Sequence, residues 1–244
     1  MICIPMAGKS SRFYENGFTK PKFQLSVSNI SLFRLSTMSF TEYFETEYFL
    51  FILNSFNGAK EFVEKEIKKL RIVNYSIVEL DHETRGQADT VAKAVSQNHK
   101  NMNEHLLIFN IDTIRPQFKY PKHFPNFPWI ETFKSKGDHW SFIDPLPNTD
   151  EVLRVAEKER ISDLCSTGMY FFPSIKVYME LFSLYESDAI NDELYIAPMY
   201  QLLIKRGATV KFSVIESSKI FLAGIPEEFH SLDADKLLRS LKIL

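Results

Sequence analysis

Apolar and polar positions alternate in blocks along the first half of the chain. Short apolar runs, each long enough for one buried strand, are separated by stretches with helical spacing. The predicted strands are Ile2–Met6, Glu47–Leu53, Asn74–Leu80 and Leu106–Ile111, and the predicted helices are Ser31–Phe44, Ala59–Leu70 and Gly86–Asn98. Strands that alternate with helices in this way indicate an α/β fold with a mainly parallel sheet.

The pattern changes in the second half of the chain. Between Pro116 and Pro147 lie six of the chain's 11 prolines, so we expect an irregular excursion or an antiparallel insertion there, not a helix. Further strands are predicted at Trp140–Ile143, Val152–Ala156, Met169–Phe172 and Thr209–Ile215, and further helices at Ile175–Glu186, Glu193–Lys205 and Asp233–Leu241. With neither a repeat nor a linker in the pattern, we predict one domain with two lobes.

Composition and charge exclude several classes of protein. The net charge is -2, so nothing draws the whole chain to nucleic acid or to an anionic membrane. The 2 cysteines imply no disulfide framework. The first residues lack the charged region of a signal peptide, and no apolar run approaches the roughly 18 residues of a membrane span. We therefore expect a soluble, cytoplasmic protein that binds neither nucleic acid nor membrane.

The loop after the first predicted strand is a candidate anion site. Gly8-Lys9-Ser10 resembles the end of a P-loop, but the early glycine that a P-loop needs is replaced by Cys3, and no strand fits before it. A turn of small residues after a strand still exposes several backbone N–H groups, which bind anions. Arg12 and Lys22 would add two cations, and such a set suits a triphosphate.

Asp112 follows the apolar run LLIFNI and should lie at the carboxyl edge of the sheet, where α/β proteins bind ligands. A carboxylate there can hold Mg²⁺, which prefers oxygen ligands and phosphate oxygens. The alternative is an aspartate that caps the next turn, and Asp112 taken alone fits that better. The presence of Gly8, Arg12 and Lys22 in the same chain favours the metal.

Other candidates carry weaker signals. Gly86 allows close backbone approach and Gln87 has the donor and acceptor that suit a base edge, although an ordinary strand-to-helix loop explains both equally well. Glu157-Lys158 could bind a hydroxyl and a phosphate of an acceptor, but such pairs are also common on surfaces. Gly168 could line a pocket or form a turn. Glu193 is predicted to begin a helix and to interact with its dipole.

The order of the segments IPMAGKSSRF, PK, TRGQADTV, FNIDTI, VAEK, STGMYFF and GIPEEF resembles the nucleoside-triphosphate transferase family. This family contains the sugar-1-phosphate nucleotidyltransferases and their cytidylyltransferase relatives, and the resemblance runs from Ile2 to about Phe229. It implies a three-layer, Rossmann-like α/β fold with a mixed, mainly parallel sheet. We expect a single domain over 1–244, with a nucleotide-binding half at about 1–114 and an acceptor-binding half at about 115–244.

The resemblance also implies a role for each candidate residue. Ala7, Gly8, Lys9, Ser10 and Ser11 would hold the triphosphate with Arg12, Lys22 would steady the α-phosphate, Gly86 and Gln87 would read the base, Asp112 would bind Mg²⁺, and Glu157, Lys158, Gly168 and Glu193 would hold the acceptor. The implied reaction transfers a nucleoside monophosphate from a nucleoside triphosphate to a phosphorylated acceptor, with a sugar 1-phosphate favoured. The family's usual setting is cell-surface polysaccharide synthesis, and the oligomeric state is left open.

Two departures from the family's pattern keep alternatives open. Ser10 replaces the second glycine of the usual G-x-G-T-R loop, and Leu222 stands where many members carry a second metal-binding aspartate. Metal binding would then depend on Asp112, phosphates and water. Leu222 is the best support for a non-catalytic nucleotide sensor, whereas the intact Arg12, Lys22 and Asp112 argue against it. The second alternative is a cytidylyltransferase that acts on a non-sugar phosphate such as phosphocholine.

Overall fold

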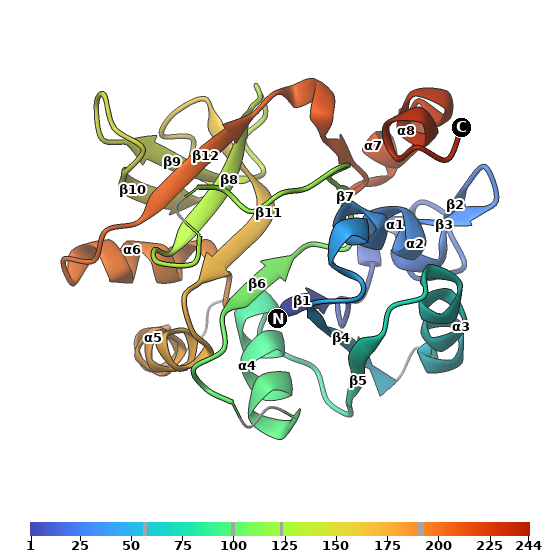
Figure 1. Ribbon diagram of the computed structural model, residues 1–244, viewed down its shortest axis with the longest axis horizontal. Helices are drawn as coiled ribbons and strands as arrows, with labels where there is room; N and C mark the ends of the chain where they lie inside the picture. The colour runs from blue at the N-terminus through green and yellow to red at the C-terminus, as the bar shows by residue number, and fades with distance from the viewer. Residues whose placement is uncertain (56–57, 99–100, 123, 190–192) are drawn as a thin grey trace. The chain divides into compact units, whose positions relative to one another are not determined.

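The computed structural model describes residues 1–55, 58–98, 101–122, 124–189 and 193–244 (Figure 1). The chain divides into two compact units, each built from segments far apart in the sequence. The first, here called the parallel unit, consists of Ile2–Glu83, Asn110–Lys119 and Ser218–Leu244; the second, the antiparallel unit, consists of Met1, Thr84–Phe109 and Tyr120–Ser217. Among the described helices, none has the length and apolar character needed to cross a bilayer.

Three parallel strands form the sheet of the parallel unit. β4 (Tyr48–Asn54) lies between β1 (Ile2–Pro5) and β5 (Asn74–Leu80) and pairs in parallel with both. Residues 49–54 of β4 are all buried, as expected for a central strand covered on both faces. The three strands predicted for this part of the chain are confirmed.

Helices and short strands surround this sheet. They are α1 (Ser11–Glu15), a 3₁₀ turn (Lys22–Gln24), β2 (Ser26–Val27), β3 (Ile30–Ser31), α2 (Leu32–Thr37), a 3₁₀ segment (Met38–Tyr43), α3 (Lys60–Leu70), β7 (Thr113–Ile114), β13 (Phe221–Leu222), α7 (Pro226–His230) and α8 (Ala234–Ser240). In α3 the buried Val63 and Ile67 share one face, and Arg71 ends the helix in the left-handed conformation.

The predicted helix Ser31–Phe44 is shorter than expected. Its α-helical part ends at Thr37, and the 3₁₀ segment that follows is kinked at Phe40. Ser39 explains the change, because its hydroxyl accepts a hydrogen bond from the Arg115 amide at 2.9 Å and its carbonyl accepts one from the Phe118 amide. Bonds to this neighbouring segment replace those that would continue the helix.

A buried carboxylate ties α2 to α3. Glu66 accepts hydrogen bonds from the Ser31 hydroxyl and from Nζ of Lys69, the latter at 2.5 Å, and Nε of Arg34 lies 3.5 Å away. Burial alone would raise the pKa of Glu66, but these hydrogen bonds and the charges of Arg34 and Lys69 hold it below its usual value. The ionised carboxylate therefore stabilises this part of the parallel unit.

The sheet of the antiparallel unit is centred on one long strand. It contains β6 (Leu106–Phe109), β8 (Trp129–Lys134), β9 (Ser141–Pro145), β10 (Val152–Glu157), β11 (Leu164–Phe172) and β12 (Lys211–Ile215). All of β11 is buried, and it pairs antiparallel with β6, β8 and β9. β10 pairs antiparallel with β9, and β12 is parallel to β8. Of the two alternatives predicted between Pro116 and Pro147, the antiparallel insertion is confirmed by β8 and β9. Residue 123 of this range lies outside the described residues.

Helices α4 (Gln87–Asn98), α5 (Ile175–Asp188) and α6 (Ala197–Lys205) complete this unit, and α4 and α5 lie side by side (Figure 1). The Tyr178 hydroxyl of α5 donates to the Ala88 carbonyl of α4 at 2.7 Å. The predicted α/β fold with a mixed sheet is confirmed, with its consecutive parallel strands in the parallel unit. The proposed boundary near residue 114 stays a prediction.

Candidate functional site

The glycine-containing loop lies at the carboxyl edge of the parallel sheet. The loop follows β1. Nδ2 of the Asn54 side chain, at the end of the neighbouring β4, donates a hydrogen bond to the Ala7 carbonyl at 2.9 Å. Ser10 adopts the left-handed conformation, with φ 54°, and α1 begins at the next residue. The Ser10 hydroxyl accepts a hydrogen bond from the Lys22 amide at 3.1 Å. The loop is thus held at both ends while Gly8, Lys9 and Ser11 stay exposed.

Two cationic side chains of this loop are open to solvent. Lys9 forms an exposed ion pair with Glu83, at 2.8 Å between Nζ and Oε1. Arg12 is exposed at the start of α1, and no carboxylate of the described residues pairs with its guanidinium. Because exposed ion pairs are weak, both cations are available to an anion that binds at the loop.

Lys22 and Asp112 meet in the parallel unit. Nζ of Lys22 lies 2.5 Å from Oδ2 of Asp112, and the two side chains are 24% and 18% exposed. Lys22 begins the 3₁₀ turn after Pro21, and the Asp112 carbonyl accepts a hydrogen bond from the Ala223 amide at 2.8 Å. A Cβ added to Gly224 would lie 3.4 Å from Asp112 Oδ2. The two groups that the sequence singles out for the phosphates and the metal are therefore in direct contact.

Asp112 is the carboxylate that the sequence predicts as a magnesium ligand, and this assignment stays a prediction. Within the described ranges, no three His, Cys, Asp or Glu side chains gather as a metal site. Leu222 lies in β13 opposite Thr113 and offers no oxygen from its side chain. Mg²⁺ is often held by one or two carboxylates together with phosphate oxygens and water. The partly exposed carboxylate of Asp112 matches that donor set.

The loop predicted to read the base opens α4, as expected, and it belongs to the antiparallel unit together with Glu157, Lys158 and Glu193. Gly86 has φ +131°, and a Cβ there would lie 2.6 Å from the Leu194 carbonyl oxygen and 2.8 Å from its nitrogen. The Leu194 amide donates to the Arg85 carbonyl at 2.5 Å, and its carbonyl accepts from the Ala88 amide at 2.9 Å. Glycine is required here because the Leu194 backbone packs against it, which no sequence signal revealed.

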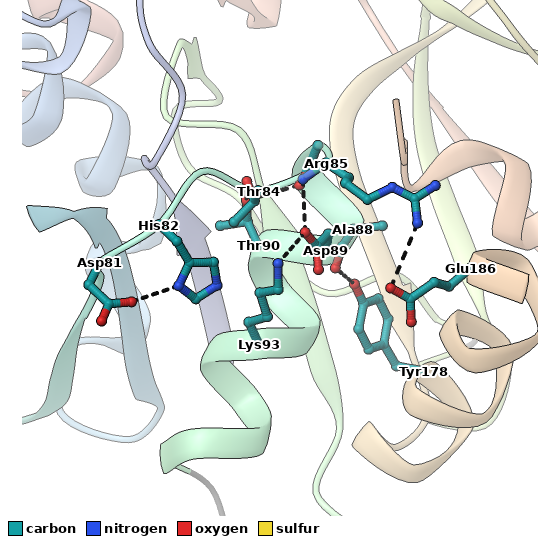
Figure 2. A network of polar contacts seen from close by, with 11 residues as sticks. Asp81, His82, Thr84, Arg85, Ala88, Asp89, Thr90, Lys93, Tyr178 and Glu186 are labelled. Carbon is teal, nitrogen blue, oxygen red and sulfur yellow. Dashed lines mark hydrogen bonds and ion pairs between the residues drawn. The ribbon is translucent and has the colours of Figure 1, made fainter. Parts of the chain in front are cut away.

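Polar contacts hold this loop on α4 and α5 (Figure 2). The buried Asp89 accepts hydrogen bonds from the Arg85 amide at 2.8 Å and from Nζ of Lys93 at 2.7 Å. The Arg85 guanidinium donates to the Ala189 carbonyl and lies 3.8 Å from Oε1 of Glu186. Arg85 therefore ties the start of α4 to the end of α5.

Glu157 ends β10 and is held from one side by a hydroxyl pair. Its Oε2 accepts a hydrogen bond from the Ser141 hydroxyl at 2.5 Å, and Ser141 Oγ lies 3.0 Å from the Tyr170 hydroxyl. In the β9–β10 register Ser141 is the direct partner of Glu157. Burial raises the pKa of Glu157, against the opposing effects of Ser141 and of the Lys158 charge.

Both the backbone and the side-chain ammonium of Lys158 make hydrogen bonds. Its φ is 55°, in the left-handed region, and its amide donates to the Trp140 carbonyl at 3.0 Å. Its Nζ lies 4.4 Å from the centroid of the Tyr195 ring and donates to the Tyr195 hydroxyl, which in turn donates to Glu193. The predicted acceptor residues Glu157, Lys158 and Glu193 are thus neighbours in one unit.

The prediction for Glu193 as a helix start was wrong. α6 begins at Ala197, and residues 193–195 precede it without helical structure. Both polar backbone groups of Leu194 bond to the Arg85–Ala88 loop, so they cannot serve a helix. Pro198 lies in the first turn of α6, where its missing N–H is tolerated. Glu193 contacts Tyr195 and not a helix terminus.

Gly168 lies inside β11. Its φ is 81°, its amide donates to the Ser166 hydroxyl at 3.0 Å, and the β11–β8 register shifts between Ser166 and Tyr170. Glycine thus permits a bulge in a buried strand. Sequence reasoning missed Ser141 and Tyr195, because only the strand register and the path of residues 193–195 bring them to Glu157 and Lys158.

Comparison with solved structures gave extensive matches. A nucleoside-diphosphate-sugar pyrophosphorylase from Vibrio cholerae RC9 is 37% identical, with a TM-score of 0.89 over 97% of this chain and 99% of that one. An inositol-1-phosphate CTP transferase from T. maritima is 16% identical, with a TM-score of 0.78 over 99% and 95%. A UDP-glucose pyrophosphorylase complexed with UDP-glucose is 15% identical, with a TM-score of 0.74 over 100% and 98%.

At such low identities the last two show a shared fold alone. Comparisons with protein-family models and with curated proteins gave no match.

Proposed function

Because the chain belongs to the nucleotidyltransferase family, we propose that it transfers a nucleoside monophosphate from a nucleoside triphosphate to a phosphorylated acceptor and releases pyrophosphate. A sugar 1-phosphate is the favoured acceptor, and the product would then be a nucleoside diphosphate sugar. The observation that carries the proposal is the contact between Lys22 and Asp112 in the same unit as the exposed loop with Arg12. Binding a triphosphate takes cations, an oxygen ligand for a metal and backbone N–H groups, and our candidates for these roles are Arg12 and Lys22, Asp112, and the loop Ala7–Ser11.

The reaction in this proposal is an in-line displacement at phosphorus. An oxygen of the acceptor phosphate forms a bond to the α-phosphorus, and the bond from that phosphorus to the bridging oxygen breaks with its electrons going to pyrophosphate. Such transfers depend mainly on positioning and on neutralising charge. Magnesium bound through Asp112 and the phosphates would supply positive charge to the leaving group.

The residues of the parallel unit act on the triphosphate. The amides of the loop Ala7–Ser11 and the Arg12 guanidinium bind the β- and γ-phosphates, and Arg12 stabilises the charge that develops on pyrophosphate. Lys22 neutralises the α-phosphate while Asp112 limits where its ammonium can lie. The 2.5 Å contact and the partial burial of both side chains support this assignment.

The residues of the antiparallel unit act on the base and the acceptor. Gly86 and Gln87 face the base, the Glu157 carboxylate accepts a hydrogen bond from an acceptor hydroxyl, and the Lys158 ammonium binds the acceptor phosphate. Two sets of contacts support these roles. The Ser141 hydroxyl, itself bonded to the Tyr170 hydroxyl, limits the Glu157 carboxylate to few conformations, and the Tyr195 ring does the same for the Lys158 ammonium. A place in cell-surface polysaccharide synthesis, in the cytoplasm, is the setting that we propose.

The test is pyrophosphate release in the presence of Mg²⁺. CTP, UTP, GTP, ATP and dTTP are each supplied with a pool of sugar 1-phosphates and, separately, with phosphocholine. The proposal expects release with one nucleotide that depends on the sugar phosphate pool. Release with phosphocholine alone would establish the cytidylyltransferase alternative. A nucleotide that raises the melting temperature without release from any acceptor would instead favour a sensor.

A further inference from the structure

Residues 193–195 link the loop at the start of α4 to Lys158. Leu194 is wholly buried, and its amide and carbonyl bond to the Arg85 carbonyl and the Ala88 amide. On either side of the buried Leu194, Glu193 is exposed and Tyr195 is partly buried. The Tyr195 hydroxyl donates a hydrogen bond to Glu193.

Tyr195 restricts a side chain that would otherwise be mobile. Lys158 is exposed and has a long, flexible stem, and its backbone bond to Trp140 leaves the ammonium free to move. The Tyr195 ring lies 4.4 Å from the ammonium, and the Tyr195 hydroxyl accepts a hydrogen bond from it. A cation–π contact and a hydrogen bond to a charged group together select one position of the ammonium.

Gly86 in turn fixes the place of Tyr195. Any Cβ at Gly86 would meet backbone atoms of Leu194 at 2.6 to 3.0 Å, and backbone atoms cannot turn aside as a flexible side chain does. A larger residue must therefore push Leu194 away and carry Tyr195 with it. The loop that contains Gly86 cannot easily move away from Leu194 instead, because the Arg85 amide of this loop donates a hydrogen bond to the Asp89 carboxylate on α4.

We propose that Tyr195 is a positioning residue that sets the Lys158 ammonium for the phosphate of the acceptor, and that the contact between Gly86 and Leu194 holds Tyr195 in place. The inference rests on the proposed function, because it takes Lys158 as the group that binds the acceptor phosphate. A specific consequence is that residues 193–195 contact both the base-reading loop, through Leu194, and the acceptor-binding Lys158, through Tyr195. A change at Gly86 then weakens acceptor binding without touching the acceptor.

Two variants at Tyr195 separate the contributions of its ring and its hydroxyl. Tyr195→Phe keeps the ring and loses the hydroxyl, and we expect the KM for the acceptor to rise about fivefold. Tyr195→Ala removes both contacts with Lys158, and we expect the KM for the acceptor to rise about twentyfold. The KM for the nucleotide and the melting temperature should stay close to those of the wild type. Tyr185→Phe, in α5 of the same unit, is the matched control and should leave both KM values unchanged.

Gly86→Ala tests the link to the loop, with Gly207→Ala as its matched control. Both glycines have positive φ, but a Cβ at Gly207 would meet nothing within 4 Å. We expect Gly86→Ala to raise the KM for the acceptor at least as much as Tyr195→Ala does, and Gly207→Ala to leave it unchanged. Gln87→Ala should raise the KM for the nucleotide alone.

The outcomes distinguish this inference from the proposed function. If the wild-type enzyme transfers nucleotide but the Tyr195 variants keep their acceptor KM, Tyr195 has no positioning role. If Gly86→Ala changes only the nucleotide KM, the link through Leu194 is absent. If the wild type transfers to no acceptor at all, the proposed function fails and this inference fails with it.

Discussion

Nζ of Lys22 lies 2.5 Å from Oδ2 of Asp112, although 90 positions of sequence separate the two residues. Each side chain is mostly shielded from water, at 24% and 18% exposed, so each restricts the other before any substrate binds. A lysine that approaches a phosphate alone would have to give up many rotamers first. The pair therefore presents an ammonium and a carboxylate in a fixed relation.

Replacing Lys22 should remove catalysis and leave folding intact. We expect Lys22→Ala to lower turnover at least about a hundredfold, the effect of losing one preorganised donor to the transition state. The measurement is the rate of pyrophosphate release at saturating substrates, together with the melting temperature. Lys20→Ala, which removes an exposed lysine of the same segment, is the control and should keep the wild-type rate. A near-normal rate for Lys22→Ala would remove Lys22 from the site.

Replacing Asp112 should change the response to magnesium. Asp112→Asn keeps the size of the side chain but loses the charge that binds a hard cation. We expect activity to be low and no longer to rise along a Mg²⁺ titration that saturates the wild type. Asp81→Asn, at an exposed position of the parallel unit, should titrate like the wild type. An unchanged titration for Asp112→Asn would contradict its assignment as the metal ligand.

The residues that we propose for the phosphates could be selected from the sequence because they occur in short, local patterns, and their role stays a prediction. A strand followed by a small loop places Gly8 and Arg12, and a strand end places Asp112 near a sheet edge. The acceptor side could be predicted only in part. Glu157 and Lys158 are adjacent in sequence, but Ser141 and Tyr195 reach them through strand register and backbone bonds between distant segments.

The predicted ends of two helices were wrong because tertiary contacts compete there with the local sequence pattern. Residues 193–196 have the composition of a helix start, yet the Arg85–Ala88 loop takes the backbone groups of Leu194 and delays the helix to Ala197. Ser39 ends the α-helical part of 31–44 in the same way, through bonds to Arg115 and Phe118. Neither partner can be read from the sequence near the helix itself.

If Glu157 binds the acceptor as proposed, kcat/KM for the acceptor should show an acid limb at a pH above the ordinary carboxylate range. Burial raises the pKa of Glu157 above its ordinary value of 4.5, and Lys158 and Glu193 are the charged groups that act on it. The ionised carboxylate accepts a hydrogen bond from an acceptor hydroxyl more strongly than the protonated acid does, so kcat/KM for the acceptor should fall as pH falls through the raised pKa.

The Ser141 hydroxyl lowers the pKa of Glu157, because it donates to the charged form. Ser141→Ala should therefore move the acid limb of kcat/KM to higher pH, and Ser162→Ala, a hydroxyl bonded elsewhere in the unit, should not. A limb that stays in place or moves to lower pH in Ser141→Ala would show that Glu157 does not control acceptor binding.

The buried carboxylate of Glu66 should matter for stability and not for catalysis. Its pKa is lower in the folded state than in the unfolded state, so its contribution is present above the unfolded value of 4.5 and is lost as pH falls through the folded value. We expect Glu66→Gln to lower the free energy of unfolding by about 1 to 3 kcal/mol near neutral pH. Urea unfolding at pH 7 and pH 3 measures this difference.

The difference between wild type and Glu66→Gln should narrow at pH 3, because that pH lies below the unfolded pKa of 4.5 and part of the stabilisation by the ionised carboxylate is lost there. Glu64→Gln, a neighbouring position on α3 that is less buried, is the control. A difference that widens toward low pH would mean that the pKa shift has the opposite sign.

The central claim is that this protein moves a nucleotidyl group, and the fate of labelled phosphorus tests it most directly. Nucleoside triphosphate labelled with ³²P at the α-position, and separately at the γ-position, is incubated with Mg²⁺, the acceptor pool and the enzyme, and the products are separated. We expect the α-label to join the acceptor and the γ-label to leave as pyrophosphate. Transfer of the γ-label to the acceptor, or its release as inorganic phosphate, would contradict the claim.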